Sequence, residues 1–367
     1  MKEIRERINV TKSSMPPYDE FMAELKPVWE SRWLSNRGAA SVKFENMLKK
    51  YLDTPNLYLF ANGHVALEVA LNALDLNGEV ITTPYTHCST THSIVRNGLT
   101  PVFCDVKEDD YTINPDLIES LITDKTVAIV ATHVYGFLCD VDAIEKIAKK
   151  HNLMVIYDAA HAFGVRKNGI SAANFGDAAM FSTHATKVFH TIEGGIVSYK
   201  DEKKFEPMSK LVNFGFSSQE DIDYVGTNAR MNEFEAVMGI CNLNHFTEEL
   251  AKRKVIGNRY YERLSDIRGI KLIDIPDDLE WNYAYFPVIF DGYKENRDEI
   301  KAKLEIENIF ARKYFYPIVN KAACYVDTYG AADVPVAAHA ADCVLTLPMY
   351  ADMTTDDVDR ICDTILR

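Results

Sequence analysis

The sequence predicts an α/β protein: a large domain whose mostly parallel sheet carries helices on both faces, then a small C-terminal α+β domain. Up to about residue 200, short β-rich runs alternate with helical periods. The runs VAIVA and LMVIY are continuously apolar, as in strands that are covered on both faces. A chain of 367 residues is longer than a single hydrophobic core usually supports, which favours a division into two domains.

The elements follow from local periodicity. In the helix expected at His64–Leu76, four apolar residues recur at helical spacing, so that one face packs inward: Leu67, Ala70, Leu71 and Leu74. The other helices expected before residue 200 are Ser89–Asn97, Pro115–Leu121 and Val141–Lys150. The expected strands are Glu79–Thr83, Pro101–Cys104, Thr126–Ala131, Leu153–Tyr157, Ala178–Ser182 and Gly195–Tyr199.

The pattern changes after residue 200. Met231 to Leu264 predicts one or two long helices, and a smaller α+β unit follows. Its expected elements are a strand at Tyr283–Phe290, a helix at Arg297–Glu305, a β-like run near Ile309 and a closing helix at Thr355–Leu366. The expected boundary lies between residues 245 and 270, which gives a large domain at 1–250 and a small C-terminal domain at 251–367.

The amino-acid composition argues against some classes of function. There are 54 acidic and 40 basic side chains, a formal net charge of −14, which argues against a nucleic-acid partner but not against a small anionic ligand. The start MKEIRERINV lacks the apolar run of a signal peptide, and no stretch is long and apolar enough for a membrane helix. The seven cysteines are scattered without any CxxC pair, which predicts reduced, buried thiols in a cytoplasmic protein with no metal site.

The strongest candidates for catalytic and ligand-binding residues lie in the stretch Leu153–Gly195. Asp158 ends one apolar strand, Ser182 ends another, and Lys187 follows in a polar turn before Glu193-Gly194-Gly195. Ligands bind beyond the carboxyl ends of such strands, so these side chains converge on one crevice. Pyridoxal phosphate requires a lysine for its aldehyde, a carboxylate for its pyridine nitrogen, and hydroxyls and N–H groups for its phosphate. Separately, the lysine could be a solvated loop residue and the aspartate a strand-end cap; together they favour the cofactor site.

These motifs resemble those of the DegT/DnrJ/EryC1/StrS sugar aminotransferases, which are fold-type-I pyridoxal-phosphate enzymes. The resemblance rests on Asp158-Ala159-Ala160-His161, on Ser182 to Lys187 (STHATK) and on Glu193-Gly194-Gly195. It extends over nearly the whole chain through WLSN at 33–36, Phe44-Glu45, NGHVAL at 62–67 and GTNARM at 226–231.

The resemblance implies roles residue by residue. Lys187 would hold the cofactor and shuttle the proton, Asp158 would pair with the pyridine nitrogen, and His161 would touch the ring or its 3-hydroxyl. The phosphate would lie on Ser182, Gly63 and His64, at the start of a helix whose dipole favours an anion. His64 replaces the usual threonine or serine, and His87 stands where an aromatic residue normally stacks on the ring.

Asn228 in this family reaches the phosphate from the neighbouring subunit, which implies a homodimer with shared active sites. The alternative for Asn228 is the N-cap of a helix at Ala229–Met238. Four residues are substrate-binding candidates: Tyr135, Arg230, Tyr314 and Tyr316. A core position is the alternative for Tyr135, and Arg312 and Lys313 could meet a diphosphate, although a surface place is as reasonable for Lys313.

The implied activity is transfer of an amino group from L-glutamate to a nucleotide-linked keto sugar. The wider sequence is closest to the branch that aminates C4 of dTDP-4-keto-6-deoxy-D-glucose for surface polysaccharide, the O-antigen included. C3 amination and a UDP- or GDP-linked sugar stay open, as do a pyridoxal-phosphate sugar dehydratase or lyase and a non-enzymatic regulator. A nucleotide-binding oxidoreductase is disfavoured because no GxGxxG follows the first strand.

Overall fold

The computed structural model describes residues 6–367, and its largest layer is a seven-stranded sheet in the order β1-β9-β8-β5-β4-β2-β3. The strands are β1 (Leu57–Phe60), β2 (Glu79–Thr82), β3 (Thr100–Phe103), β4 (Thr126–Thr132), β5 (Met154–Asp158), β8 (Ala178–Ser182) and β9 (Gly195–Tyr199). Neighbouring strands from β3 to β8 pair in parallel, and β9 pairs antiparallel with both β8 and β1. The mostly parallel sheet is therefore confirmed.

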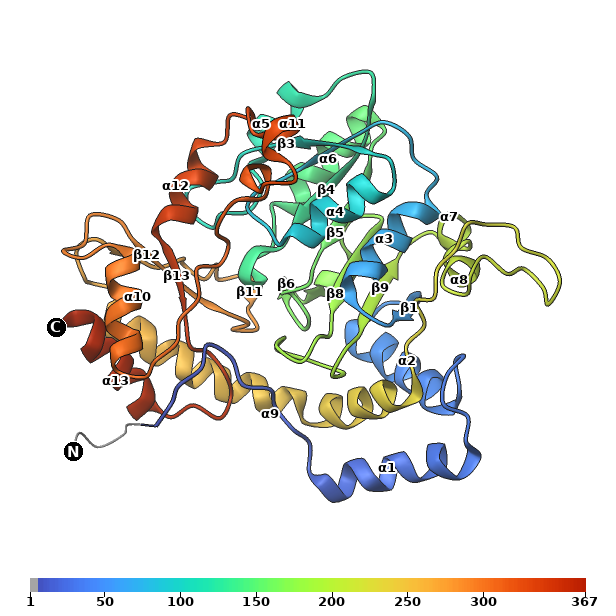
Figure 1. Cartoon of the computed structure of the whole chain (residues 1–367), viewed down its shortest axis with the longest axis horizontal. Helices are drawn as coiled ribbons and strands as arrows, with labels where there is room; N and C mark the ends of the chain where they lie inside the picture. The colour runs from blue at the N-terminus through green and yellow to red at the C-terminus, as the bar shows by residue number, and fades with distance from the viewer. Residues whose placement is uncertain (1–5) are drawn as a thin grey trace.

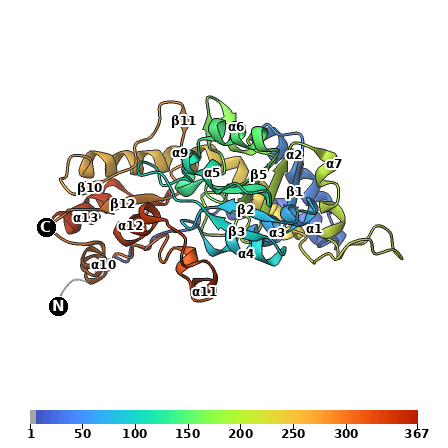
Figure 2. The same cartoon turned by 90° about the horizontal axis from the view of Figure 1, so that it is seen from above.

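Helices cover both faces of this sheet (Figures 1 and 2). One apolar cluster joins Leu67 of α3 (Gly63–Ala73) and Ile94 of α4 (Cys88–Arg96) to Val130 of β4. The other cluster joins helices on the opposite face to the adjacent residue Ile129. Because side chains alternate along a strand, these adjacent residues face opposite ways, and both are fully buried. The opposite face carries α2 (Ala39–Leu52), α6 (Val141–His151) and α9 (Glu233–Leu264).

The long helix α9 is a single helix of 32 residues, which resolves the choice between one and two. It begins at a capping box, in which the Asn232 side chain accepts from Glu235 N–H and the Glu235 carboxylate accepts from Asn232 N–H. The interpretation of Asn228 as the N-cap is therefore wrong. The helix crosses residue 250 without a break, and the division into 1–250 and 251–367 stays a prediction.

The C-terminal part has a three-stranded sheet in the order β10-β12-β13, made by β10 (Ile270–Lys271), β12 (Phe286–Phe290) and β13 (Val344–Leu347). Helices α10 (Arg297–Ile306), α12 (Pro335–Cys343) and α13 (Thr355–Leu366) accompany it. The β-like run expected near Ile309 is only an isolated bridge to Ile8, and the strand expected from Tyr283 begins at Phe286. The N-terminal segment thus lies against the C-terminal part (Figure 1).

Several elements were not expected from periodicity. They are α1 (Tyr18–Ser31), α2 and β1, the small sheet of β6 (Arg166–Lys167), β7 (Ile170–Ser171) and β11 (Leu279–Glu280), β10, β13, and the helices α7 (Glu202–Phe205), α8 (Met208–Leu211), α11 (Val326–Tyr329) and α12. The remaining helix before residue 200, α5 (Pro115–Leu121), has the expected bounds. Most of the unexpected elements are too short to show a period.

The cysteines differ from expectation. Cys88 and Cys324 are exposed and Cys343 is half-buried, so only four of the seven are buried thiols; all seven are free. Within residues 6–367, no helix has the length and apolarity that a membrane span requires. Residues 1–5, part of the stretch used to judge a signal peptide, lie outside the described residues.

Candidate active site

A cleft of about 360 Å³ lies at the carboxyl ends of the central strands and collects most of the predicted site residues. Its walls include eight of them: Gly63, His64, His87, Asp158, His161, Ser182, Lys187 and Tyr314. They come from the start of α3, the turn before α4, the ends of β5 and β8, and the C-terminal part. The convergence expected from strand topology is therefore present in the structure.

Asp158 is the last residue of β5 and is held by two donors. Its Oδ2 accepts a hydrogen bond of 2.6 Å from Thr90 Oγ1, and its Oδ1 accepts one of 3.1 Å from Ala160 N–H. A buried chain of hydroxyls continues from Thr90 to Thr86 at 2.8 Å and from Thr86 to Thr132 at 2.9 Å. The carboxylate is only 3 % exposed, so these donors fix its orientation against the cleft.

Replacing Thr90 with valine is expected to leave Asp158 Oδ2 without its donor. A hydrogen bond to a charged group contributes about 1.5–3 kcal/mol, so we expect an activity loss of about tenfold or more. Steady-state transamination assays on Thr90→Val and on the Thr90→Ser control, which keeps the hydroxyl, test this. Equal activity of the valine variant and the parent would contradict the positioning role.

Lys187 lies in a tight turn that is fastened at several points. Lys187 N–H donates to His184 O, and Ala185 N–H donates to Ile192 O. Ser13 Oγ, from the N-terminal segment, donates to Ala185 O at 2.6 Å. The Lys187 Nζ lies 5.8 Å from the centre of the Tyr285 ring, on the cleft side of the turn. These bonds restrict where the amine can reach.

An anion fits where α3 starts. The Asn62 side chain caps this helix by accepting from Val65 N–H at 2.9 Å. A Cβ on Gly63 would lie 2.8 Å from Ser182 Cβ, so glycine is what allows the helix start to approach the end of β8 so closely. The buried His64 Nδ1 has no partner within residues 6–367, which leaves a polar atom unsatisfied at the same place. A phosphate group is the chemistry that these groups suit.

Two histidines, His87 and His161, line the cleft. Burial, with the nearby Lys187 charge, holds the pKa of His161 well below its ordinary value and lowers the pKa of His87. His161 Nδ1 accepts from Tyr135 N–H at 3.1 Å, and its Nε2 lies 3.3 Å from Tyr314 Oη. His161 is therefore neutral near pH 7, which suits contact with a neutral ring face or a hydroxyl.

Five residues proposed from the sequence lie elsewhere, Asn228 among them. Tyr135 is fully buried behind His161, which fits its alternative as a core tyrosine. Tyr316 is about half exposed and packs on the charges of Arg297 and Lys313. Arg230 lines another cavity, beside Arg37, and donates to Asn213 and Asn228. Lys313 pairs with Asp298, as a surface residue would.

Several wall residues were not predicted as site residues. They include Thr86, Ser89, Tyr285 and Phe315, and Thr90 supports the wall from behind. Arg312, considered only as a diphosphate contact, also lines the cleft, with its guanidinium 4.4 Å from the Tyr314 ring centre. The polar run YTHCSTTHS at 85–93 was a usable signal, since so many hydroxyls beside a strand end are rarely needed for packing alone.

His133, which follows β4, gives a pH-dependent prediction. Burial lowers its pKa to about 3, and its Nδ1 accepts from Cys139 N–H at 3.1 Å. The unfolded imidazole titrates near 6.5, so between pH 6.5 and 3 the unfolded state binds more protons and stability falls as pH falls. We expect a loss of about 1.4 kcal/mol per pH unit below 6.5 from this residue.

His133→Asn keeps an acceptor but cannot titrate, so its stability should depend less on pH. Urea unfolding of both proteins at pH 7.5 and 5.5 measures the difference. Identical slopes with pH would show that His133 does not carry this dependence.

The comparisons with known proteins agree with the fold and the cleft. A crystal structure of DesI in the presence of its TDP-sugar product superposes with a TM-score of 0.93 at 31 % identity, covering 98 % of this chain and 92 % of that one. Proteins named dTDP-4-amino-4,6-dideoxy-D-glucose transaminase from Shigella dysenteriae and Escherichia coli are 40 % and 38 % identical over 98 % of each chain.

The fold, with its lysine and aspartate in one cleft, defines an enzyme of the transaminase class. The sequence profile of the DegT/DnrJ/EryC1/StrS aminotransferase family matches residues 18–366. The chain belongs to that family.

Proposed function

We propose that this protein uses pyridoxal 5′-phosphate to transfer the amino group of L-glutamate to C4 of dTDP-4-keto-6-deoxy-D-glucose, in the synthesis of a surface polysaccharide. The observation that carries the cofactor is the meeting of Lys187, Asp158 and the start of α3 in one cleft. The observation that carries the sugar is the identity of about 40 % to two proteins named for that product.

The cleft suits the cofactor at each of its ends. Ser182 Oγ and the backbone N–H groups of Gly63 and His64 would hold its phosphate, Asp158 its pyridine nitrogen, and Lys187 its aldehyde. When bound, the cofactor supplies an electron sink that makes the α-proton of an amino acid removable.

The residues of the cleft then have separate roles. The Asp158 carboxylate, oriented by Thr90 and Ala160, keeps a proton on the ring nitrogen. Lys187 takes and returns the proton at the reacting carbon. His161 and Tyr314 form one wall, and Arg312 places a guanidinium near it that suits the carboxylate of glutamate or a phosphate of the sugar nucleotide.

The test is incubation of the purified enzyme with L-glutamate and a panel of keto-sugar nucleotides that varies the nucleotide and the position of the keto group. Products are identified by mass spectrometry and NMR. We expect the dTDP-4-amino-4,6-dideoxyhexose to form fastest. Preference for a 3-keto sugar, or for a UDP or GDP carrier, would overturn the substrate.

We further propose a homodimer in which the partner's Asn228 completes the phosphate site. Asn228 and Arg230 lie outside the cleft of their own chain, which fits a role across an interface. Large apolar side chains are exposed on and beside α1 and α2: Met22, Trp29, Trp33, Leu34 and Val42. An exposed apolar patch of this kind is typical of a protein–protein interface.

Asn228→Ala is expected to weaken cofactor binding about tenfold, the cost of a lost hydrogen bond to an anion, while the dimer persists. Cofactor titration with light scattering measures both. Asn213→Ala, which removes the partner of Arg230 without touching the proposed phosphate contact, is the control. Unchanged affinity in Asn228→Ala would contradict the shared site.

A further inference from the structure

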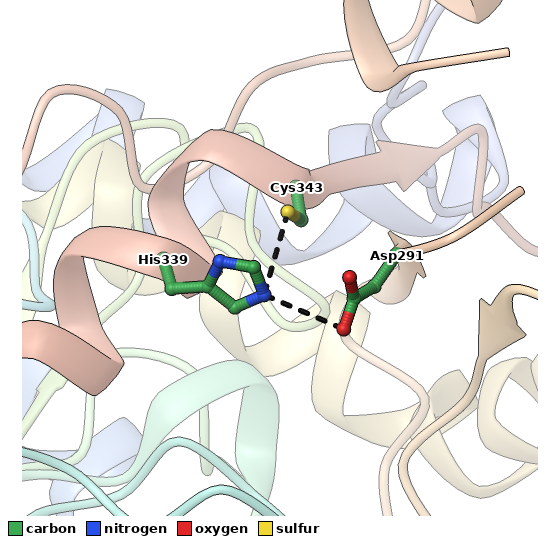
Figure 3. Close-up of side chains that lie close together, drawn as sticks. All are labelled: Asp291, His339 and Cys343. Atoms are coloured by element: carbon green, nitrogen blue, oxygen red, sulfur yellow. Dashed lines mark hydrogen bonds and ion pairs between the residues drawn. The ribbon is translucent and has the colours of Figure 1, made fainter.

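A histidine, a cysteine and an aspartate meet on the C-terminal part, away from the cleft. His339 and Cys343 are four residues apart on α12, so they lie on one face of that helix. Asp291 directly follows β12. Figure 3 shows the three side chains pointing toward one another, with dashed lines that join the His339 ring to Cys343 and to Asp291. Within residues 6–367, they form the one such group whose ligand atoms all lie within 4.8 Å of one another.

The spacing of the ligand atoms matches a shared ion better than direct contact. His339 Nε2 lies 3.4 Å from Asp291 Oδ2 and 3.8 Å from Cys343 Sγ. A good N–H···O hydrogen bond is shorter, about 2.7–3.2 Å. Tetrahedral ligands at roughly 2.0–2.3 Å from a zinc ion are about 3.3–3.8 Å from one another. The two distances from His339 therefore suit an ion held by these side chains, and the third pair, Asp291 and Cys343, lies within 4.8 Å.

The donor set selects the kind of ion. A thiolate and an imidazole favour Zn²⁺ and similar borderline cations over Mg²⁺ or Ca²⁺, which take oxygen ligands. Asp291 and His339 are accessible to solvent, so a water can occupy the fourth position. We propose that Asp291, His339 and Cys343 bind a divalent cation of the zinc class with one exchangeable water.

The position suggests a structural effect. Asp105, just beyond β3, accepts from Val336 and Ala337 N–H at the start of α12 and so attaches that end to the large part. At the other end of α12, the ion would join the helix to β12. Since the ion binds the folded arrangement and α12 covers the C-terminal sheet, binding should raise the melting temperature. The cluster does not line the cleft, so the ion is not needed for transamination.

The first test adds Co²⁺ to untagged, chelator-treated holoenzyme and records the difference spectrum. We expect thiolate charge-transfer and tetrahedral d–d bands, a Zn²⁺-dependent rise in melting temperature, and displacement of Co²⁺ by Zn²⁺. Cys343→Ser and His339→Ala should each weaken binding by at least about tenfold, a loss that even partners beyond the ligands can cause. The control Cys324→Ser removes an exposed thiol elsewhere.

Absence of the bands, or bands that persist in Cys343→Ser and vanish in Cys324→Ser, would overturn the site.

Lys271 provides a second test with the opposite sign. Its Nζ lies 3.0 Å from Asp291 Oδ2, the same oxygen that faces His339, and its charge opposes a cation there. The side chain is well exposed, so Lys271→Gln should fold normally. We expect this variant to bind Zn²⁺ severalfold more tightly by competition titration. Unchanged or weaker binding would contradict an ion held beside Asp291.

Discussion

Lys187→Ala is expected to reduce transamination by about 10⁴-fold or more, because the variant loses both the covalent attachment and the proton carrier. No other lysine lines the cleft among the described residues, and the turn that holds Lys187 is fastened mainly by backbone bonds, so the fold should survive. The loss should fall on kcat, since the amine acts on the reacting carbon.

The measurement combines steady-state kinetics with the visible absorbance of bound cofactor. The parent should show a band that borohydride bleaches and the variant should not. Lys200→Ala, at an exposed lysine just after β9, is the matched control and should behave like the parent. Retained turnover in Lys187→Ala would remove this residue from its proposed role.

Asp158→Asn is expected to reduce activity by about 10²–10⁴-fold with the fold intact, the range that a proton-positioning group usually contributes. The amide is nearly isosteric and keeps an oxygen for Thr90 or Ala160. It lacks the negative charge that holds a proton on a ring nitrogen. The effect should exceed that of Thr90→Val, since Thr90 acts through Asp158.

Kinetics and cofactor titration on Asp158→Asn test the expectation, with circular dichroism to verify folding. Asp177→Asn is the control. Asp177 Oδ2 accepts from the N–H of Val155, which lies on the same strand as Asp158, but Asp177 does not line the cleft. Normal transamination by Asp158→Asn would show that the carboxylate charge is dispensable.

Strong periodicity predicted the central elements well. Strands β2 to β5, β8 and β9 and helices α3 to α6 lie within a few residues of expectation, because apolar runs and helical spacing reflect burial at the level of the local sequence. The weak elements were missed for the same reason. Helices α1 and α2 carry exposed apolar residues such as Trp29 and Val42 beside their charges. In α2 these obscure the buried face that Phe44 and Leu48 form.

The site residues also differ in whether the sequence predicts them. Asp158, Ser182 and Lys187 were predictable because strand ends in a parallel sheet meet at one edge. Arg312 and Tyr285, which line the cleft, and Thr90, which holds Asp158 from behind it, were not assigned to the site, since each comes from an element far away in the chain. Tyr135 also follows a strand, yet its ring turns into the core.

The sequence alone determined the α/β class, the acid–lysine pair and the family resemblance, since these depend on residues that lie close together or recur with a period. The tertiary structure alone decided which side chains complete the cleft, that the N-terminal segment lies on the C-terminal part, and that Asp291 meets His339 and Cys343. Those arrangements depend on packing between segments separated by as many as 354 residues, and no local sequence pattern indicates such contacts.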